Sequence, residues 1–431
     1  MNRTLDPSPL SGTLQIMPSK SASHRAVMLS SMAMGESILE PLQLSDDIRA
    51  TLDCAQQLGL TRGLVLSDAG LPGFVRARIK GRSRDAEKRS MRTLDCGESG
   101  STLRFFIPLA LDGRGPVRFR GRGRLMQRPL SIYEDIFKPQ GVSWELRGND
   151  LTVEGRLQSG QYTLPGNVSS QFITGLLLSL PLLKEDSSIT LATPLESQAY
   201  VEMTRQIQKL YGMESIWSQD GRTLYIPGSQ IPRSPGTVHV EGDWSQAAFF
   251  LTAGVLGSGE VSLTGLDMNS LQADRAIVAI LESMGARITL SKGMITASAS
   301  RLMGRSVDVS QFPDLVPILA VAMAAAGGES HITGAARLRL KESDRLSAMA
   351  QALQACGCLC MEEEDGLFIR GGLRLHGAQV EGCQDHRIVM AMAVASAFSS
   401  GRITITDAEA VAKSAPTFWQ DFKALGGRYE G

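Results

Sequence analysis

The sequence has little of several features that would fix its class at once. Only 5% of its 431 residues are aromatic, cysteine occurs six times, and 44 basic residues balance 44 acidic ones. Because the charges cancel, no overall field attracts nucleic acid or an anionic membrane, and any anion must be bound by local arrangement. Six irregularly spaced cysteines are too few for a disulfide framework, which favours a reducing, cytoplasmic setting.

Long apolar runs are missing as well. The longest, at 176–183 and 318–326, are far shorter than the roughly 20 residues that cross a bilayer, and no leader-like segment opens the sequence. We therefore expect a soluble protein without a membrane partner. The 43% of hydrophobic residues is enough for two or three cores, which excludes a disordered chain.

Nucleotide and metal motifs are also absent. There is no G-x-x-x-x-G-K-[ST] loop, and Gly121 and Gly123 lack the third glycine of a dinucleotide fingerprint. The five histidines are scattered without the spacing of metal ligands. We expect no cofactor and no metal. The remaining equipment is lysine, arginine, serine and a few carboxylates, which suits the binding of multiply anionic small molecules and the transfer of protons.

A repeat that occurs six times indicates the architecture. Each copy opens with a short polar stretch and continues as an apolar segment, and the copies begin at Ser19, Gly97, Val168, Gly242, Ser310 and Cys383. A β-like stretch follows each apolar segment, and in five copies an amphipathic helix comes next. The first helix of a copy is apolar nearly all round and should be interior, whereas the second is two-sided and should cover a sheet.

Six successive α/β modules predict two domains of three modules each. We expect the hinge at 232–241, where Pro232 and Pro235 lie among glycine and serine residues. From these patterns alone, the strand before Pro18 fits either half.

The polar starts of the first helices are candidate anion sites, because a helix N-terminus carries free N–H groups and partial positive charge. Ordinary capping by serine or aspartate explains any single copy equally well. Arginines gather at 118–128, where we interpret Arg124 and Arg128 as anion clamps and the preceding ones as a solvated strand face. Aromatic stacking platforms are scarce there, so we expect no nucleic-acid partner.

Several segments together resemble the 5-enolpyruvylshikimate-3-phosphate (EPSP) synthase family. In chain order they are SKSASHR from Ser19, GESGS from Gly97, RP from Arg128, SSQ from Ser169, PD from Pro313, KESDR from Lys341, DHR from Asp385 and AKS from Ala412. The resemblance implies an α/β fold of two domains, each with three βαβαββ units, of the inverted α/β barrel type of enolpyruvyl transferases. The implied domains are 1–18 with 238–431, and 19–237, with hinges near 17–20 and 232–241.

The resemblance also implies a reaction. The enolpyruvyl group of phosphoenolpyruvate passes to the 5-hydroxyl of shikimate 3-phosphate and phosphate leaves, through a tetrahedral ketal. Carried over by position, Asp314 resembles the base for the hydroxyl, Glu342 the acid and base at the methylene carbon, Lys20 a contact to both substrates, and Lys413 an aid to phosphate departure.

The binding residues follow by the same resemblance. For shikimate 3-phosphate they are Lys20, Ser21, Arg25, Ser169, Ser170, Gln171, Ser197, Tyr200, Asp314 and Lys341. For phosphoenolpyruvate they are Lys20, Gly100, Arg128, Gln171, Arg345, Arg387 and Lys413. Glu98 and Arg337 depart from the family pattern and are left out. The expected state is a monomer.

The alternative function is the related transfer of enolpyruvate to UDP-N-acetylglucosamine in the same fold. That family typically has a loop cysteine and a Lys-Asn start. This chain has Ser19-Lys20-Ser21 instead, and no cysteine between Cys96 and Cys356, which favours the shikimate substrate.

Overall fold

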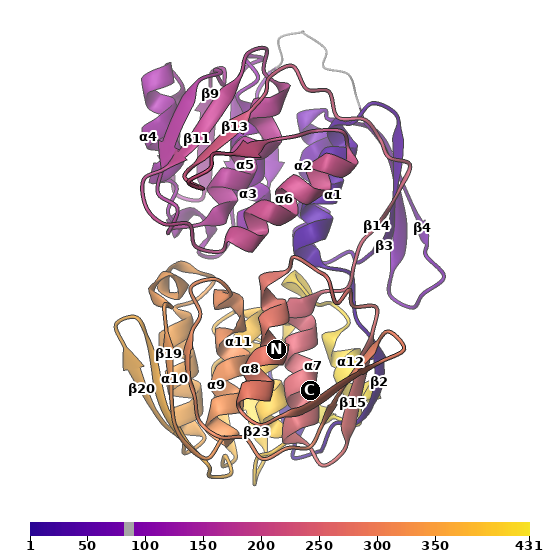
Figure 1. The fold of residues 1–431 in the computed structure, drawn as a ribbon, viewed down its shortest axis with the longest axis vertical. Helices are drawn as coiled ribbons and strands as arrows, with labels where there is room; N and C mark the ends of the chain where they lie inside the picture. The colour runs from indigo at the N-terminus through magenta and orange to yellow at the C-terminus, as the bar shows by residue number, and fades with distance from the viewer. Residues whose placement is uncertain (82–89) are drawn as a thin grey trace. The chain divides into compact units, whose positions relative to one another are not determined.

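The computed structural model describes residues 1–81 and 90–431. The chain forms two compact units, each with its own internal contacts. Unit 1 consists of Met1–Ser19 and Glu241–Gly431, and unit 2 consists of Lys20–Val240. Figure 1 shows both units as layers of helices and small sheets.

Unit 2 contains three four-stranded sheets. Its strands are β3 (Glu36–Leu42), β4 (Thr61–Asp68), β5 (Val75–Gly81), β6 (Arg92–Asp95), β7 (Val117–Arg120), β8 (Ser143–Arg147), β9 (Asp150–Glu154), β10 (Gln161–Leu164), β11 (Ser187–Leu191), β12 (Ile216–Trp217), β13 (Thr223–Ile226) and β14 (Thr237–His239). Its α-helices are α1 (Lys20–Met32), α2 (Asp46–Leu58), α3 (Gly100–Ala110), α4 (Ser131–Phe137), α5 (Ser170–Ser179) and α6 (Gln198–Leu210).

Unit 1 also contains three four-stranded sheets. Its strands are β1 (Arg3–Asp6), β2 (Gly12–Gln15), β15 (Glu260–Thr264), β16 (Arg287–Ser291), β17 (Met294–Ser298), β18 (Ser306–Asp308), β19 (Gly328–Thr333), β20 (Leu359–Glu363), β21 (Gly366–Gly371), β22 (Ala378–Val380), β23 (Ile403–Ile405) and β24 (Arg428–Glu430). Its α-helices are α7 (Trp244–Leu256), α8 (Ile277–Ser283), α9 (Val316–Ala325), α10 (Arg345–Ala355), α11 (His386–Ser396) and α12 (Phe418–Ala424).

All six sheets share one pattern, a parallel pair of strands extended by two antiparallel strands. In the third copy, for example, β10 runs parallel to β11, and β11, β13 and β12 follow in antiparallel order. Strands from the ends of the units complete three of the sheets. The N-terminal β2 pairs with β15 and β1 pairs with β23 and β24, so the first residues belong to unit 1. In the same way β14, at the end of unit 2, completes the sheet of β3.

The polar start of each repeat opens a helix, as the sequence predicts. The six first helices are α1, α3, α5, α7, α9 and α11, and they are buried almost throughout, with every residue of α11 buried. Within unit 1, α7, α9 and α11 pack against one another and form its centre (Figure 1). An apolar surface on all sides is what such a central position requires.

The second helices lie where the amphipathic patterns predict them, with one addition. In α2, for instance, Ser45 caps the N-terminus and Gly59 ends the helix with a left-handed φ of 79°. The second copy also has a second helix, α4, which the pattern does not predict. It is seven residues long and lies between Pro129 and Pro139, which mark the segment as a loop in the sequence. In the described parts of the chain, no helix is long and apolar enough to cross a membrane.

Candidate active site

Three helix N-termini of unit 1 meet at one buried arginine. Arg345 opens α10 and is 1% exposed. Its Nε donates to Asp385 Oδ2 at 2.8 Å, its Nη1 to Asp314 Oδ1 at 2.9 Å and its Nη2 to Glu342 Oε2 at 2.9 Å. Asp314 precedes α9, and Asp385 caps α11 by accepting from the backbone N–H of Arg387. We call Asp314, Glu342 and Asp385, with Arg345 between them, the carboxylate cluster.

Two further cations surround Asp314. Arg387 donates from Nη2 to Asp314 Oδ2 at 3.1 Å and from Nη1 to the backbone carbonyl at 3.0 Å, and Lys341 Nζ lies 3.8 Å from Oδ1. Burial opposes the charge on Asp314, but Arg387, Lys341 and Arg345 outweigh it and hold the pKa of this carboxyl well below its ordinary value. Asp314 is therefore ionised and ready to accept a proton.

Lys341 shows the opposite balance. Its pKa falls to about 8, because burial disfavours the ammonium more than the charge of Asp314 favours it. A lysine with this pKa exchanges its charge just above neutral pH, so its binding of an anion should depend on pH.

A fourth carboxyl of unit 1, Asp274, lies behind Asp314. It is 1% exposed, and Ser245 at the start of α7 donates to its Oδ2. Its Oδ1 has no hydrogen-bond partner among the described residues. Burial, followed by the charge of Asp314, raises the pKa of Asp274. Asp274 therefore tends to hold a proton where Asp314 does not.

Lys413 reaches the same helix start as the carboxylate cluster. It ends a short 3-10 segment (Ala408–Lys413), and its Nζ donates to the backbone carbonyl of Gln384 at 2.6 Å. Gln384 directly precedes Asp385, the cap of α11. The structure therefore brings all six predicted residues of unit 1 to one region: Asp314, Lys341, Glu342, Arg345, Arg387 and Lys413.

The predicted residues of unit 2 also lie at helix N-termini. Lys20 is the first residue of α1, and its Nζ pairs with Asp47 Oδ2 in the first turn of α2 at 2.8 Å. One turn later in α1, Arg25 donates from Nη1 to the backbone carbonyl of Ser21 at 2.7 Å. These contacts fix both cations against the start of the helix.

Arg25 is 3% exposed, yet its hydrogen-bond partners in the described chain are neutral oxygens. Nε donates to Thr204 Oγ1 at 2.8 Å, and Nη2 donates to the carbonyl of Tyr200 at 3.0 Å and to Thr174 Oγ1 at 3.3 Å. Burial lowers the pKa of Arg25 to about 10, which still leaves it charged at neutral pH. A buried guanidinium held only by neutral groups is suited to bind a phosphate.

Gly100, at the start of α3, leaves room for two guanidinium groups. A Cβ at this position would lie 2.8 Å from Arg104 Nη1, 3.0 Å from Arg128 Nη1 and 3.4 Å from Gln171 Oε1. Arg104 Nη1 donates to Gln171 Oε1 at 2.8 Å, and Gln171 Nε2 donates to Ser101 Oγ at 3.0 Å. The absence of a side chain thus allows both arginines to approach the N–H groups of the first turn. We call Gly100, Arg104, Arg128 and Gln171 the guanidinium cluster.

Three serines complete the predicted set in unit 2. Ser169 caps α5 by accepting from the backbone N–H of Gln171 at 3.3 Å, and Ser170 is the first residue of that helix. Ser197 precedes α6 with a left-handed φ of 54° and is 4% exposed. Such strained, buried positions are frequent at functional sites. The ring of Tyr200 lies 6.0 Å from the guanidinium of Arg25.

Several site residues were not predicted. Asp47, Arg104, Asp274 and Asp385 have no role in the sequence-based interpretation. Asp385 could have been found, since it directly precedes an apolar repeat segment, and Arg104 lies one helical turn after Gly100. Asp47 and Asp274 give no local signal, because only the tertiary structure brings them to their partners.

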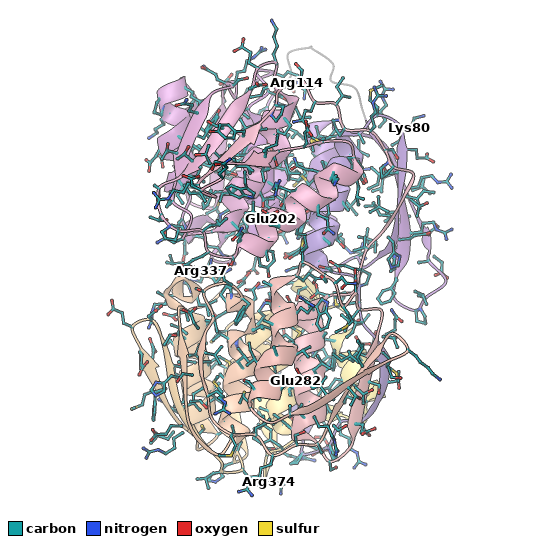
Figure 2. The ribbon with its side chains drawn as sticks, in the orientation of Figure 1. Lys80, Arg114, Glu202, Glu282, Arg337 and Arg374 are labelled. Carbon is teal, nitrogen blue, oxygen red and sulfur yellow. The ribbon has the colours of Figure 1, made fainter. Side chains whose placement is uncertain are left out.

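The arginine run and the departing residues also have structural explanations. Arg118 and Arg120 face Asp150, and Arg122 pairs with Asp95 on the surface, as expected for a solvated strand face. Arg128 is buried, whereas Arg124 is exposed. Arg337, labelled in Figure 2, donates to the backbone carbonyl of Ser310. Glu98 packs over Gly123, where an added Cβ would lie 2.7 Å from its Oε2.

Comparison with known proteins adds three findings. A family model described as EPSP synthase (3-phosphoshikimate 1-carboxyvinyltransferase) matches residues 5–422. A 3-phosphoshikimate 1-carboxyvinyltransferase from Clostridium novyi is 43% identical over 428 residues, covering 99% of this chain and 98% of the relative. Another from Clostridium acetobutylicum is 42% identical and covers 98% and 97%.

Solved structures agree with these sequences. EPSP synthase from Acinetobacter baumannii superposes with a TM-score of 0.77 at 25% identity, and all of each chain is covered. The enolpyruvyl transferase NikO from Streptomyces tendae gives a TM-score of 0.79 at 16% identity, covering all of this chain and 98% of the other, which supports the fold alone. The expected two-domain α/β fold of the enolpyruvyl transferases is confirmed.

Proposed function

The chain belongs to the EPSP synthase family, and from this premise we propose how its two units share the family's reaction. The enzyme transfers the enolpyruvyl group of phosphoenolpyruvate to the 5-hydroxyl of shikimate 3-phosphate, in the shikimate pathway to chorismate and the aromatic amino acids. Its substrates carry two phosphates and two carboxylates, so the site must bind several anions and also move protons.

In the proposed division, unit 1 carries the proton transfers. Glu342 protonates the methylene carbon of phosphoenolpyruvate, the 5-hydroxyl oxygen attacks the neighbouring carbon, and Asp314 accepts the hydroxyl proton. In the second step Glu342 takes a proton back from the new methyl group, the carbon–oxygen bond to phosphate breaks with its electron pair leaving on phosphate, and the double bond is restored. The observation that carries this assignment is that Arg345 donates hydrogen bonds to both Asp314 and Glu342, each at 2.9 Å.

The cations around Asp314 make its basicity depend on whether the substrates are bound. With its pKa held low by three cations, Asp314 is ionised but weakly basic. Arg387 and Lys341 are also proposed substrate ligands. When a bound anion shares these cations, their effect on Asp314 falls and its basicity rises, so the base becomes effective once both substrates are bound.

Unit 2 supplies the anion sites in this proposal. Shikimate 3-phosphate is bound by Arg25, Ser21, Tyr200, Gln171 and the serines at the starts of α5 and α6, and phosphoenolpyruvate by the guanidinium cluster. Lys20 contacts both substrates. Bidentate guanidinium contacts match carboxylate and phosphate geometry. In unit 1, Lys341 adds a contact to shikimate 3-phosphate, while Arg345 and Arg387 hold phosphoenolpyruvate and Lys413 assists the departing phosphate. The two units are the proposed domains of three repeats each.

The setting is also part of the proposal. All six cysteines are free, which fits a reducing compartment such as the cytoplasm. A monomer without a nucleic-acid or membrane partner is proposed, and analytical ultracentrifugation tests this state directly.

The activity is tested by phosphate release from phosphoenolpyruvate with purified protein. We expect release that depends on shikimate 3-phosphate as acceptor and not on UDP-N-acetylglucosamine. Release with the sugar nucleotide alone would move the chain to the related transferase reaction, and no release with either acceptor would contradict both assignments.

A further inference from the structure

Behind the first turn of α3, four buried side chains form a hydrogen-bonded chain. His24 Nδ1 lies 2.7 Å from Thr51 Oγ1, Thr51 Oγ1 lies 2.7 Å from Thr102 Oγ1, and Thr102 Oγ1 lies 2.7 Å from Ser99 Oγ. Each of the four residues is at most 1% exposed. We call them the hydroxyl chain. It links α1, α2 and α3 and ends at the residue before Gly100.

The hydrogen bonds of this chain run in one direction. Ser99 Oγ accepts from the backbone N–H of Thr102 at 3.1 Å and from its hydroxyl at 2.7 Å. Because Thr102 has a single hydroxyl proton, Thr51 must donate in its contact with Thr102. His24 Nδ1 must then donate to Thr51, which is the Nδ1–H form of a neutral ring. Burial first, and neighbouring cations second, hold the pKa of His24 well below its ordinary value, in agreement with a neutral ring.

This arrangement exceeds what a helix cap needs. Capping α3 requires only the Ser99 side chain and the N–H of Thr102. The backbone carbonyl of Asp47 is a second acceptor that shares the same two hydroxyl protons, at 3.2 Å from Thr51 Oγ1 and 3.5 Å from Thr102 Oγ1. The carboxylate of Asp47 in turn holds Lys20 at 2.8 Å. One set of buried contacts therefore fixes both Lys20 and the start of α3.

We propose that the hydroxyl chain is a positioning device for phosphoenolpyruvate, which sets the first turn of α3, and so the backbone at Gly100, at a fixed place relative to Lys20. This inference rests on the proposed function, in which Gly100 and Lys20 bind that substrate. The four residues act through the backbone of α3 and through Asp47.

The proposal makes a selective prediction about the two substrates. Arg25, the proposed phosphate ligand for shikimate 3-phosphate, is held by oxygens of α5 and α6 and by the carbonyl of Ser21, none of which belongs to the hydroxyl chain. Lys20 is a proposed ligand of both substrates, but its contact with the Asp47 carboxylate uses no hydroxyl of the chain. Interrupting the chain should therefore weaken the use of phosphoenolpyruvate more than that of shikimate 3-phosphate.

The test compares Thr51→Val, which removes the central hydroxyl at nearly constant volume, with Thr51→Ser, which keeps it. We expect Thr51→Val to raise KM for phosphoenolpyruvate about fivefold, the factor supplied by one ordinary net hydrogen bond. We expect kcat and KM for shikimate 3-phosphate to change less than about twofold, and Thr51→Ser to restore the KM for phosphoenolpyruvate. The control is Thr252→Val in α7, a buried threonine whose hydroxyl has no partner among the described residues.

Three results would overturn the proposal: a KM in Thr51→Val no higher than in Thr252→Val, a serine variant that behaves like valine, or an equal rise in both KM values. If Thr51→Val does not fold by thermal melting, Thr102→Val and Thr102→Ser decide by the same criteria. Unfolding of both valine variants would mean that the hydroxyls serve folding, which also contradicts the proposal. If the proposed function itself is wrong, Arg128→Ala will also leave the KM for phosphoenolpyruvate unchanged. This result distinguishes failure of the proposed function from failure of the positioning proposal.

Discussion

The two units hold their buried arginines with different partners on the same repeated framework. In unit 1 the starts of α9, α10 and α11 hold carboxylates around one arginine, and every nitrogen of Arg345 is bonded to an acid. In unit 2 the buried Arg25 is bonded only to hydroxyl and carbonyl oxygens within the described chain. The acids lie at helix N-termini, where the backbone contributes partial positive charge, and Arg25 lies in the second turn of α1.

This difference shows how one repeat was adapted to two tasks. A helix N-terminus stabilises an ionised carboxylate, so a base such as Asp314 stays deprotonated and fixed there, which suits the acceptance of a proton. A guanidinium near a helix start adds to the positive field and favours a bound anion. Removing the base of unit 1 should therefore affect turnover, and removing a guanidinium of unit 2 should affect substrate affinity.

The largest expected effect comes from the base in unit 1. Asp314→Asn keeps the shape but cannot accept the hydroxyl proton, so kcat should fall by a factor on the order of 10³. Binding of shikimate 3-phosphate, measured by calorimetry, should persist because unit 2 is unchanged. Glu329→Gln, which alters an exposed acid paired with Arg370, is the control. Near-normal kcat in Asp314→Asn would remove it as the base and break the comparison.

An arginine of unit 2 should give the complementary result. Arg128→Ala removes a buried guanidinium beside Gly100, and KM for phosphoenolpyruvate should rise about 30-fold, as expected for losing hydrogen bonds to a charged group. The control is Arg120→Ala, in the same run of arginines but on the surface with Asp150. Steady-state kinetics with each substrate varied in turn separates the two KM values. A loss confined to kcat would mean that unit 2 also takes part in the chemistry.

The sequence predicts these two groups of residues better than it predicts their contacts. The six repeats and their first helices follow from apolar periodicity, and the site motifs lie at the helix starts. Nothing local indicates that Arg345 would be enclosed by three acids, because Asp314 and Asp385 are 31 and 40 residues away along the chain. The short helix α4 was missed because Pro129 and Pro139 flank it and mark the segment as a loop in the sequence.

A pH experiment sharpens the contrast from the side of unit 1. In the enzyme without substrate, Lys341 has a pKa of about 8, so its amine is charged below that pH and neutral above it. Calorimetric affinity for shikimate 3-phosphate should therefore decline above pH 8, by up to about tenfold for each pH unit. Lys341→Met should bind more weakly throughout and lose this decline, while the exposed Lys423→Met should keep it. An unchanged decline in Lys341→Met would assign the titration to another group.

The smallest expected effect concerns stability at acid pH and separates the units again. The low pKa of Asp314 and Asp385 means that their contribution to stability is present above the ordinary aspartate range and is lost only as pH falls through their lowered values. The pKa of His24 in unit 2 is lowered in the folded protein, so as pH falls His24 is protonated in the unfolded chain before it is protonated in the folded one. The free energy of unfolding therefore decreases once the pH drops below about 6.5, the ordinary pKa of histidine.

His24→Gln should therefore reduce the loss of melting temperature between pH 7 and pH 5.5, a range in which the two aspartates of unit 1 stay ionised. The control is His239→Gln, which replaces an exposed histidine of the same unit. Equal slopes of melting temperature against pH in the unmodified enzyme and in His24→Gln would show that protonation of His24 does not cause the first loss of stability as the pH falls. The first acid-sensitive group would then have to be sought beside the carboxylate cluster, where burial raises the pKa of Asp274.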